Sequence, residues 1–242
     1  MKTEDIEYHA DGARLVGYLA VDDTRTGKRP GVLVAPEGGG LVELTKQIAR
    51  RLAELGYVAF AMDYFGDGKP LADRSQVMPR IEAFMAEPAT IRARAAEALA
   101  VLARQAECDP GKLAAIGYCF GGTTVLELAR SGADLKAVVG FHSGLGTTRP
   151  QDAKAIRAKV LTCIGALDPI IPAAQRHAFE QEMTDGGVDW RMYVFGGAGH
   201  SFTNPGVGEL GMAGFTYHAE TDRRTWVAML DLFDEALGTI DA

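Results

Sequence analysis

The chain has 242 residues, of which 47% are hydrophobic and 24% charged, and its formal net charge is −7. These values are ordinary for a globular protein, and the length favours one α/β domain over residues 1–242 rather than two smaller ones. The acidic balance argues against a nucleic-acid-binding surface.

Three cysteines, at 108, 119 and 163, form neither a CxxC pair nor a zinc-binding spacing. Such a sparse, odd set is typical of a reducing compartment. The N-terminal sequence MKTEDIEYHADG lacks the apolar core of a signal peptide, and no apolar run reaches membrane-spanning length. We therefore expect a cytoplasmic protein with no metal, no cofactor, and neither a membrane nor a nucleic acid as partner.

The predicted elements alternate between strand and helix along the chain. An antiparallel hairpin comes first, around a turn at Asp11-Gly12. Alternation favours a mostly parallel sheet with helices on both faces, after that hairpin. We expect Arg92 and Arg94 to face solvent from one of these helices. The strands are predicted at 6–8, 15–21, 31–35, 57–62, 113–116, 137–141, 160–165 and 190–195, and helices at 42–55, 75–86, 88–106, 173–185 and 217–237.

The stretch from Leu113 to Arg130 carries the most informative local pattern. A short apolar strand ends in Gly117-Tyr118-Cys119-Phe120-Gly121-Gly122, and an amphipathic helix pattern follows directly. Strand, tight turn and helix with G-x-C-x-G is the setting of a nucleophile elbow, with cysteine in place of the usual serine. The helix N-terminus favours a thiolate there. Because short motifs often match by chance, the alternative is a buried core cysteine that follows a strand.

Four residues with reactive side chains each follow a predicted strand. Glu37, Cys119, Asp168 and His200 stand after the strands at 31–35, 113–116, 160–165 and 190–195. Functional residues gather at the carboxyl ends of parallel strands. Taken alone, Asp168 is a turn residue before proline, and His200 is a loop histidine among glycines.

Taken together, these residues follow the chain order of an α/β-hydrolase triad: nucleophile, acid, histidine. The order predicts an α/β-hydrolase fold in which Cys119 attacks a carbonyl, His200 transfers protons and Asp168 orients the imidazole. The oxyanion-hole donors would be the N–H groups of Phe120, directly after the nucleophile, and of Gly38.

The chain resembles the dienelactone hydrolase family over nearly its whole length. The resemblance implies the same triad and oxyanion hole, and the hydrolysis of carboxylic esters or lactones through an acyl-thiol intermediate. It rests on APEGGG at 35–40, GYCFGG at 117–122, GALDPIIP at 165–172 and AGHSF at 198–202.

The resemblance also implies a regulatory role for Glu37. This sequence differs from the family in the residues that hold the substrate. In the family, a glutamate at this place touches the resting cysteine, which limits oxidation of the thiol; a solvated loop carboxylate is the alternative. Two arginines hold the substrate carboxylate in the family. Arg80 is a loosely placed match for one, and Asn204 stands where the other is expected. Losing that charge-assisted contact favours a neutral ester or lactone as the substrate.

The likeness extends to family members that hydrolyse phosphate triesters, which implies neutral organophosphate triesters as a second substrate class. Further pocket candidates are Tyr64, Tyr118, His142 and Phe202, although aromatic residues at such places belong to the core as often as to a pocket. The oligomeric state stays open, with a homodimer as one alternative.

Two other classes of function remain as alternatives. A redox or thiol-binding protein would need a resolving thiol, but Cys108 is expected at the far end of the elbow strand and Cys163 lies inside a strand. A non-catalytic ligand-binding α/β-hydrolase fold usually lacks a triad member, and none is missing here.

Overall fold

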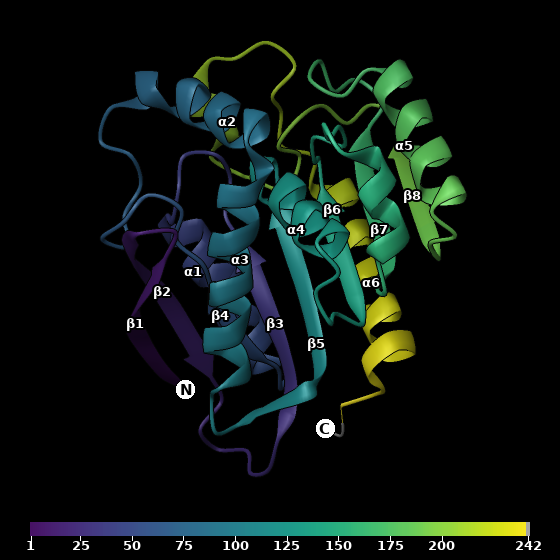
Figure 1. Ribbon diagram of the computed structural model, residues 1–242. Coiled ribbons are helices and arrows are strands. Elements are labelled where there is room, and N and C mark those ends of the chain that lie inside the picture. Colours follow the sequence, from purple (N-terminus) through teal and green to yellow (C-terminus); the bar gives the residue numbers. More distant parts are fainter. Residues whose placement is uncertain (241–242) are drawn as a thin grey trace.

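A twisted sheet of eight strands forms the centre of residues 1–240, the part of the chain that the computed structural model describes (Figure 1). The strand order is β1-β2-β4-β3-β5-β6-β7-β8. β2 pairs antiparallel with both β1 and β4, whereas the neighbours from β4 to β8 all pair parallel. The strands are β1 (Lys2–Ala10), β2 (Ala13–Val21), β3 (Arg29–Ala35), β4 (Val58–Ala61), β5 (Cys108–Tyr118), β6 (Ala137–Phe141), β7 (Lys159–Gly165) and β8 (Trp190–Phe195).

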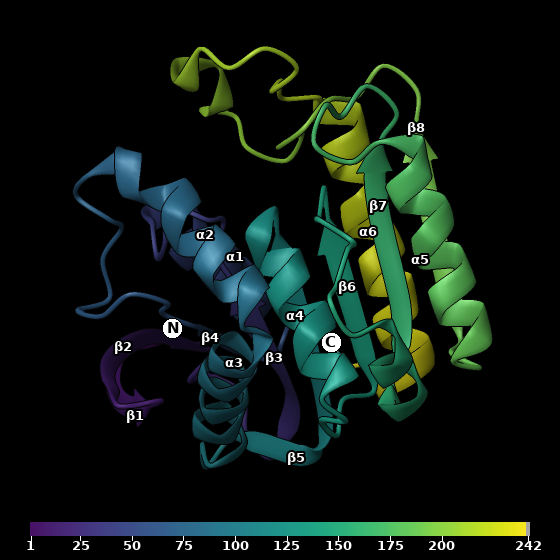
Figure 2. The same ribbon diagram turned by 45° about the horizontal axis from the view of Figure 1, so that its top comes forward.

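Helices cover both faces of this sheet (Figures 1 and 2). Apolar side chains of α3, α4 and α5 build the core on one face, and those of α1 and α6 build the core on the other. The predicted α/β-hydrolase fold, with a mostly parallel sheet and an N-terminal antiparallel hairpin, is confirmed. The helices are α1 (Glu43–Glu54), α2 (Val77–Ala86), α3 (Pro88–Ala103), α4 (Phe120–Arg130), α5 (Ala173–Asp185) and α6 (Ala219–Leu237), with short 3₁₀ turns η1 (Arg74–Gln76), η2 (Pro150–Ala155) and η3 (Val207–Leu210).

None of the helices within residues 1–240 has both the length and the apolar character that a membrane crossing requires.

The carboxyl ends of the parallel strands meet at one end of the sheet. The segment between β8 and α6, residues 196–218, arches over this end of the sheet, and α2 lies beside it (Figures 1 and 2). The loop after β4 is fixed there by the buried carboxylate of Asp63, which accepts hydrogen bonds from the backbone N–H groups of Val16, Phe65, Gly66 and Gly68 at 3.0–3.1 Å. Three of these donors belong to the loop itself, and the fourth, Val16, ties the loop to β2.

The predicted exposure of two arginines on α3 is wrong. The side chains of Arg92 and Arg94 are each only 15% exposed. Arg92 donates to Glu127 at 2.8 Å and to Asp152 at 2.6 Å, and Arg94 donates to the Tyr64 carbonyl. The reason is that α3 is flanked by α4 as well as by the sheet, so little of its circumference meets solvent.

A buried ion-pair network joins the helices on this face. The side chain of Arg130 on α4 is fully buried. It donates to both carboxylate oxygens of Glu182 on α5, at 2.7 and 2.8 Å, and to Glu127 at 3.0 Å. Its fourth hydrogen bond goes to the Leu145 carbonyl at 3.0 Å. Because Glu127 also pairs with Arg92, the network connects α3, α4 and α5.

Candidate active site

Cys119 sits in a strained turn between β5 and α4. Its backbone has φ 54° and ψ −118°, a conformation that few L-residues adopt and that clusters at functional sites. The flanking glycines permit it. A Cβ on Gly117 would lie 2.0 Å from the Gly121 carbonyl oxygen, and a Cβ on Gly121 would lie 2.1 Å from that of Ala35. The turn leaves Cys119 partly exposed at the N-terminus of α4, where the helix dipole favours negative charge.

The imidazole of His200 is held by the carboxylate of Asp168. His200 Nδ1 lies 2.7 Å from Asp168 Oδ2, and both side chains are nearly or fully buried. Asp168 Oδ1 accepts from the backbone N–H groups of Ile170 at 2.8 Å and Ile171 at 3.3 Å. The carboxylate is therefore fixed at both oxygens, and it fixes the orientation of the ring.

The pKa of His200 is raised to about 10. Burial alone lowers this pKa, since it disfavours the charged ring, but the hydrogen bond to Asp168 and the negative charges of Asp168 and Cys119 outweigh it. His200 is thus a protonated imidazolium at neutral pH. Cys119 acts electrostatically on the His200 ring, whose Nε2 has no hydrogen-bond partner within residues 1–240.

The predicted oxyanion donors belong to the first residue of α4 and to the loop after β3. Phe120 is the first residue of α4, where an N–H group has no intrahelical acceptor. Gly38 lies in the loop after β3, and within residues 1–240 no hydrogen bond from its N–H is found. A Cβ on Gly38 would lie 2.4 Å from Ile81 Cδ1, so α2 packs directly over this loop.

Glu37 bridges the loop after β3 and the loop that carries His200. Its Oε1 accepts from Ser201 Oγ at 2.9 Å, and its Oε2 accepts from Asn204 Nδ2 at 3.0 Å. Ser201 directly follows His200 and has a left-handed φ of 52°. The predicted contact between Glu37 and the resting cysteine stays a prediction, since both carboxylate oxygens are engaged by neutral donors here.

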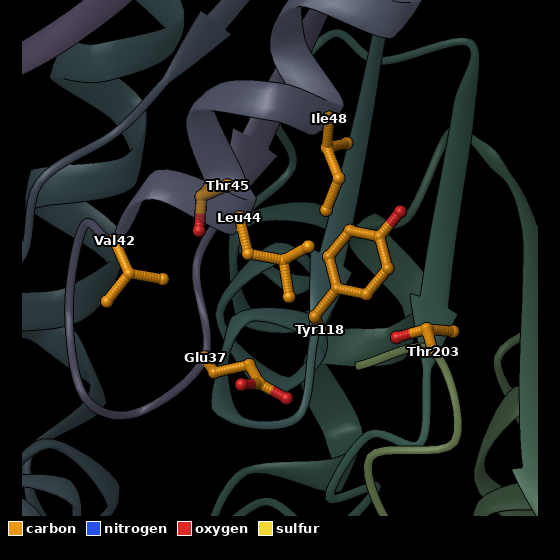
Figure 3. A pocket seen from close by; sticks show the side chains of 7 residues that line it. All are labelled: Glu37, Val42, Leu44, Thr45, Ile48, Tyr118 and Thr203. Atoms are coloured by element: carbon orange, nitrogen blue, oxygen red, sulfur yellow. The ribbon is translucent and has the colours of Figure 1, made fainter. Parts of the chain in front are cut away.

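A small cavity opens beside Glu37, between the loop after β3 and α1 (Figure 3). Its volume of about 10 Å³ is room for about one water molecule. The residues around it are Glu37, Val42, Leu44, Thr45, Ile48, Tyr118 and Thr203.

His142 contacts the elbow through its ring, a role that the sequence left undecided. Its Nδ1 accepts the backbone N–H of Cys119 at 3.1 Å, and its Nε2 lies 2.8 Å from Thr203 Oγ1. Burial, and secondarily the charge on His200, lowers the pKa of His142 well below its usual value. The ring is therefore neutral, with its proton on Nε2 and directed at Thr203. Only its position at a strand end could have marked it.

The remaining pocket candidates fall into two groups. Tyr64, Tyr118 and Phe202 are almost fully buried, and the Tyr64 ring packs edge-on against Phe120 with centroids 5.4 Å apart. Arg80 is exposed on α2. The sequence missed Ser201, Thr203 and Ile81, because each acts through contacts with residues distant in the chain.

Comparison with known proteins agrees with this geometry. A model of the dienelactone hydrolase family matches residues 15–237. The solved structure m3DLH is 46% identical, with a TM-score of 0.94 and 98% of each chain covered. A dienelactone hydrolase-like promiscuous phosphotriesterase from metagenomic libraries is 41% identical, with a TM-score of 0.92 and coverage of 98% of this chain and 99% of its own.

A Yersinia pestis protein, provisionally named a carboxymethylenebutenolidase, is 30% identical over 240 residues, which cover 93% of this chain and 85% of that protein. The family match spans residues 15–237, and the mostly parallel eight-stranded sheet agrees with it. The chain therefore belongs to the dienelactone hydrolase family.

Proposed function

We propose that this protein hydrolyses neutral carboxylic esters and lactones, with Cys119 as the nucleophile. The observation that carries the proposal is a strained, partly exposed cysteine that acts electrostatically on a buried histidine, whose Nδ1 lies 2.7 Å from a buried carboxylate. Nucleophile, base and orienting acid in this relation are the requirement for covalent acyl transfer.

The reaction would proceed in two halves. The Cys119 thiolate attacks the carbonyl carbon, and the oxyanion that forms accepts hydrogen bonds from the N–H groups of Phe120 and Gly38. Collapse of this intermediate breaks the ester C–O bond, and His200 gives its Nε2 proton to the departing alkoxide. The neutral imidazole then takes a proton from water, which attacks the acyl-thiol and releases the acid and the thiolate.

The charges around the site favour an uncharged substrate. Glu37 places a carboxylate on the loop between the oxyanion donors and the His200 segment, and its two recorded partners, Ser201 and Asn204, are neutral. Arg80 lies exposed on α2. A substrate carboxylate would therefore meet a like charge, without the bidentate arginine contact that binds carboxylates well.

A neutral phosphate triester is the second substrate class that we propose. The P=O group would accept the same two N–H donors, and thiolate attack on phosphorus would displace an aryloxide. Support comes from the phosphotriesterase with which this chain shares 41% identity over nearly its whole length.

A redox function is the main alternative for a reactive cysteine. Cys119 follows the carboxyl end of β5, whereas Cys108 is the first residue of that strand. Cys163 is buried within β7. With no second thiol beside Cys119, a disulfide-forming cycle within one chain has no partner, which favours acyl transfer.

The experiment is stopped-flow hydrolysis of a p-nitrophenyl acyl ester by wild type, Cys119→Ala, Cys119→Ser and His200→Ala. We expect a nitrophenolate burst equal to the enzyme concentration, then turnover. Both should vanish in Cys119→Ala, and turnover should fall by about 10³-fold or more in His200→Ala. Hydrolysis of paraoxon, measured in parallel, tests the proposed activity on phosphate triesters.

Cys163→Ser is the matched control, because it removes a thiol of the same sheet and should leave the burst intact. Equal rates of ester hydrolysis in wild type and Cys119→Ala would refute the proposal and favour the redox and ligand-binding alternatives.

A further inference from the structure

A second cleft lies at the opposite end of the sheet from Cys119. It is formed by the β2–β3 loop, the beginnings of β3 and β5 and the segment after α6, which lie together in Figure 1. Its volume of about 450 Å³ is in the range of small-molecule sites. The lining residues are Thr24, Arg25, Thr26, Lys28, Arg29, Pro30, Lys112, Gly238, Thr239 and Ile240.

The side chains that line this cleft give it a strong positive charge. Lys28, Arg29 and Lys112 are cationic, as is Arg25, which pairs with the Asp22 carboxylate at 3.3 Å, and none of the described lining residues is acidic. The whole chain has a formal charge of −7, so this concentration of cations runs against its overall balance. Such a local field attracts anions to the cleft.

Arg29 is the second, independent sign of an anion. It is only 6% exposed, and its Nη1 donates to the Asp22 carbonyl at 2.9 Å. Within residues 1–240, its Nε and Nη2 have no hydrogen-bond acceptor, and no carboxylate forms an ion pair with it. A buried cation without a counter-charge is unfavourable.

Arg130 shows how the same fold treats a buried arginine that has a structural role. That guanidinium is equally buried, but it is paired with two glutamates and a backbone carbonyl. Arg29 differs because its missing partner must come from the cleft that it lines. The hydroxyl groups of Thr26 and Thr239 add neutral donors around that cleft, whereas Thr24 Oγ1 donates to Asp22 Oδ1 at 2.7 Å.

We propose that this cleft binds a phosphate dianion, either free or carried by a small organic molecule. Several cations and hydroxyl donors around one concave site match the several acceptor oxygens of a phosphate. The site is separate from the elbow. Arg29 and Ala35 are the two ends of β3, about 20 Å apart along the strand, and Gly38 and Cys119 lie beyond the Ala35 end.

The test is isothermal titration calorimetry at low ionic strength with adenosine monophosphate, inorganic phosphate and uncharged adenosine. The variants are Lys28→Gln, Lys112→Gln and Arg29→Gln. Lys28 and Lys112 are exposed, so their variants should fold even if Arg29→Gln does not. Lys154→Gln, which removes an exposed lysine outside the cleft, is the matched control.

We expect wild type to bind the monophosphate and not adenosine, with about tenfold weaker binding for each cleft variant and unchanged binding for Lys154→Gln. Relative affinities for monophosphate and inorganic phosphate tell an organic ligand from the free ion. No saturable binding by wild type in the millimolar range would overturn the proposal. So would binding that the cleft variants leave unchanged, or competitive inhibition of ester hydrolysis, since the anion would then sit elsewhere.

Discussion

The environments of the three cysteines differ enough to separate their reactivity. Cys119 is partly exposed, whereas Cys108 and Cys163 are buried. Burial raises the pKa of Cys108 to about 12 and also raises the pKa of Cys163. Since the thiolate is the nucleophile, the buried thiols should be inert at neutral pH.

Iodoacetamide should therefore alkylate the native protein at Cys119 alone, whereas denatured protein should be labelled at all three cysteines. Peptide mass spectrometry after timed labelling measures this selectivity. The Cys119→Ser protein, labelled in the same way, is the control and should stay unmodified. Labelling of Cys108 or Cys163 at a rate similar to Cys119 would contradict the prediction.

The protonation of His200 should make stability depend on pH. Its pKa is raised from 6.5 to about 10 on folding, so its contribution is fully present below pH 6.5 and is lost as the pH rises through 10. The loss should be on the order of a few kcal/mol, because one pKa unit corresponds to about 1.4 kcal/mol.

Urea denaturation of wild type and Asp168→Asn measures this effect. The pH should run from about 6 to about 10, which covers the interval between the unfolded and the folded pKa of His200. The decline should be shallower in Asp168→Asn, which lacks the carboxylate that stabilises the imidazolium. An identical decline in both proteins would show that other groups cause it.

At the scale of elements, the junction of β5 and α4 depends on close backbone contact. Gly121→Ala should abolish esterase activity and lower the melting temperature, since its Cβ would lie 2.1 Å from the Ala35 carbonyl oxygen. Gly39→Ala is the matched control, because no atom lies within 4 Å of its Cβ position. Steady-state kinetics and thermal unfolding check both variants. Wild-type activity in Gly121→Ala would mean that the elbow tolerates a wider turn.

The elements that sequence predicted well are those with a strong local pattern. The strands at 137–141 and 190–195 and the helix at 173–185 match the structure at both ends. The predicted strand at 113–116 is extended in the structure to Cys108–Tyr118. Its first residues, Cys108-Asp109-Pro110, have no apolar alternation, and they are held in the sheet by backbone pairing with Arg29 and Pro30. Such pairing leaves no trace in local sequence.

The candidate site shows the same difference between features that local sequence predicts and features that it does not. Strand-end position and chain order predicted that Asp168 would pair with His200, as it does in the structure. They could not predict that Glu37 binds Ser201 and Asn204, because more than 160 residues separate these partners and any polar residue could serve. The prediction that Arg92 is exposed is wrong for a related reason. The periodicity of α3 does not reveal that α4 packs beside it.

For the molecule as a whole, the network around Arg130 is a large concentration of buried charge. Arg130→Met should destabilise the protein by about 3–5 kcal/mol, because Glu182 would remain buried without its partner and Glu127 would keep only Arg92. Arg224→Met, which breaks an exposed pair with Glu220 on α6, should cost about 1 kcal/mol or less. Chemical denaturation of both variants measures the difference. Similar losses would show that the buried network is energetically replaceable.

The packing of Ile81 over Gly38 has a consequence for how this family diversifies. α2 contacts mainly α3 and η1 rather than the sheet, yet one of its side chains rests on the loop that carries a proposed oxyanion donor. Substitutions in α2 can therefore reshape the neighbourhood of the reactive thiol while the strands and the elbow stay unchanged. This makes α2 a natural starting point for directed evolution of substrate preference.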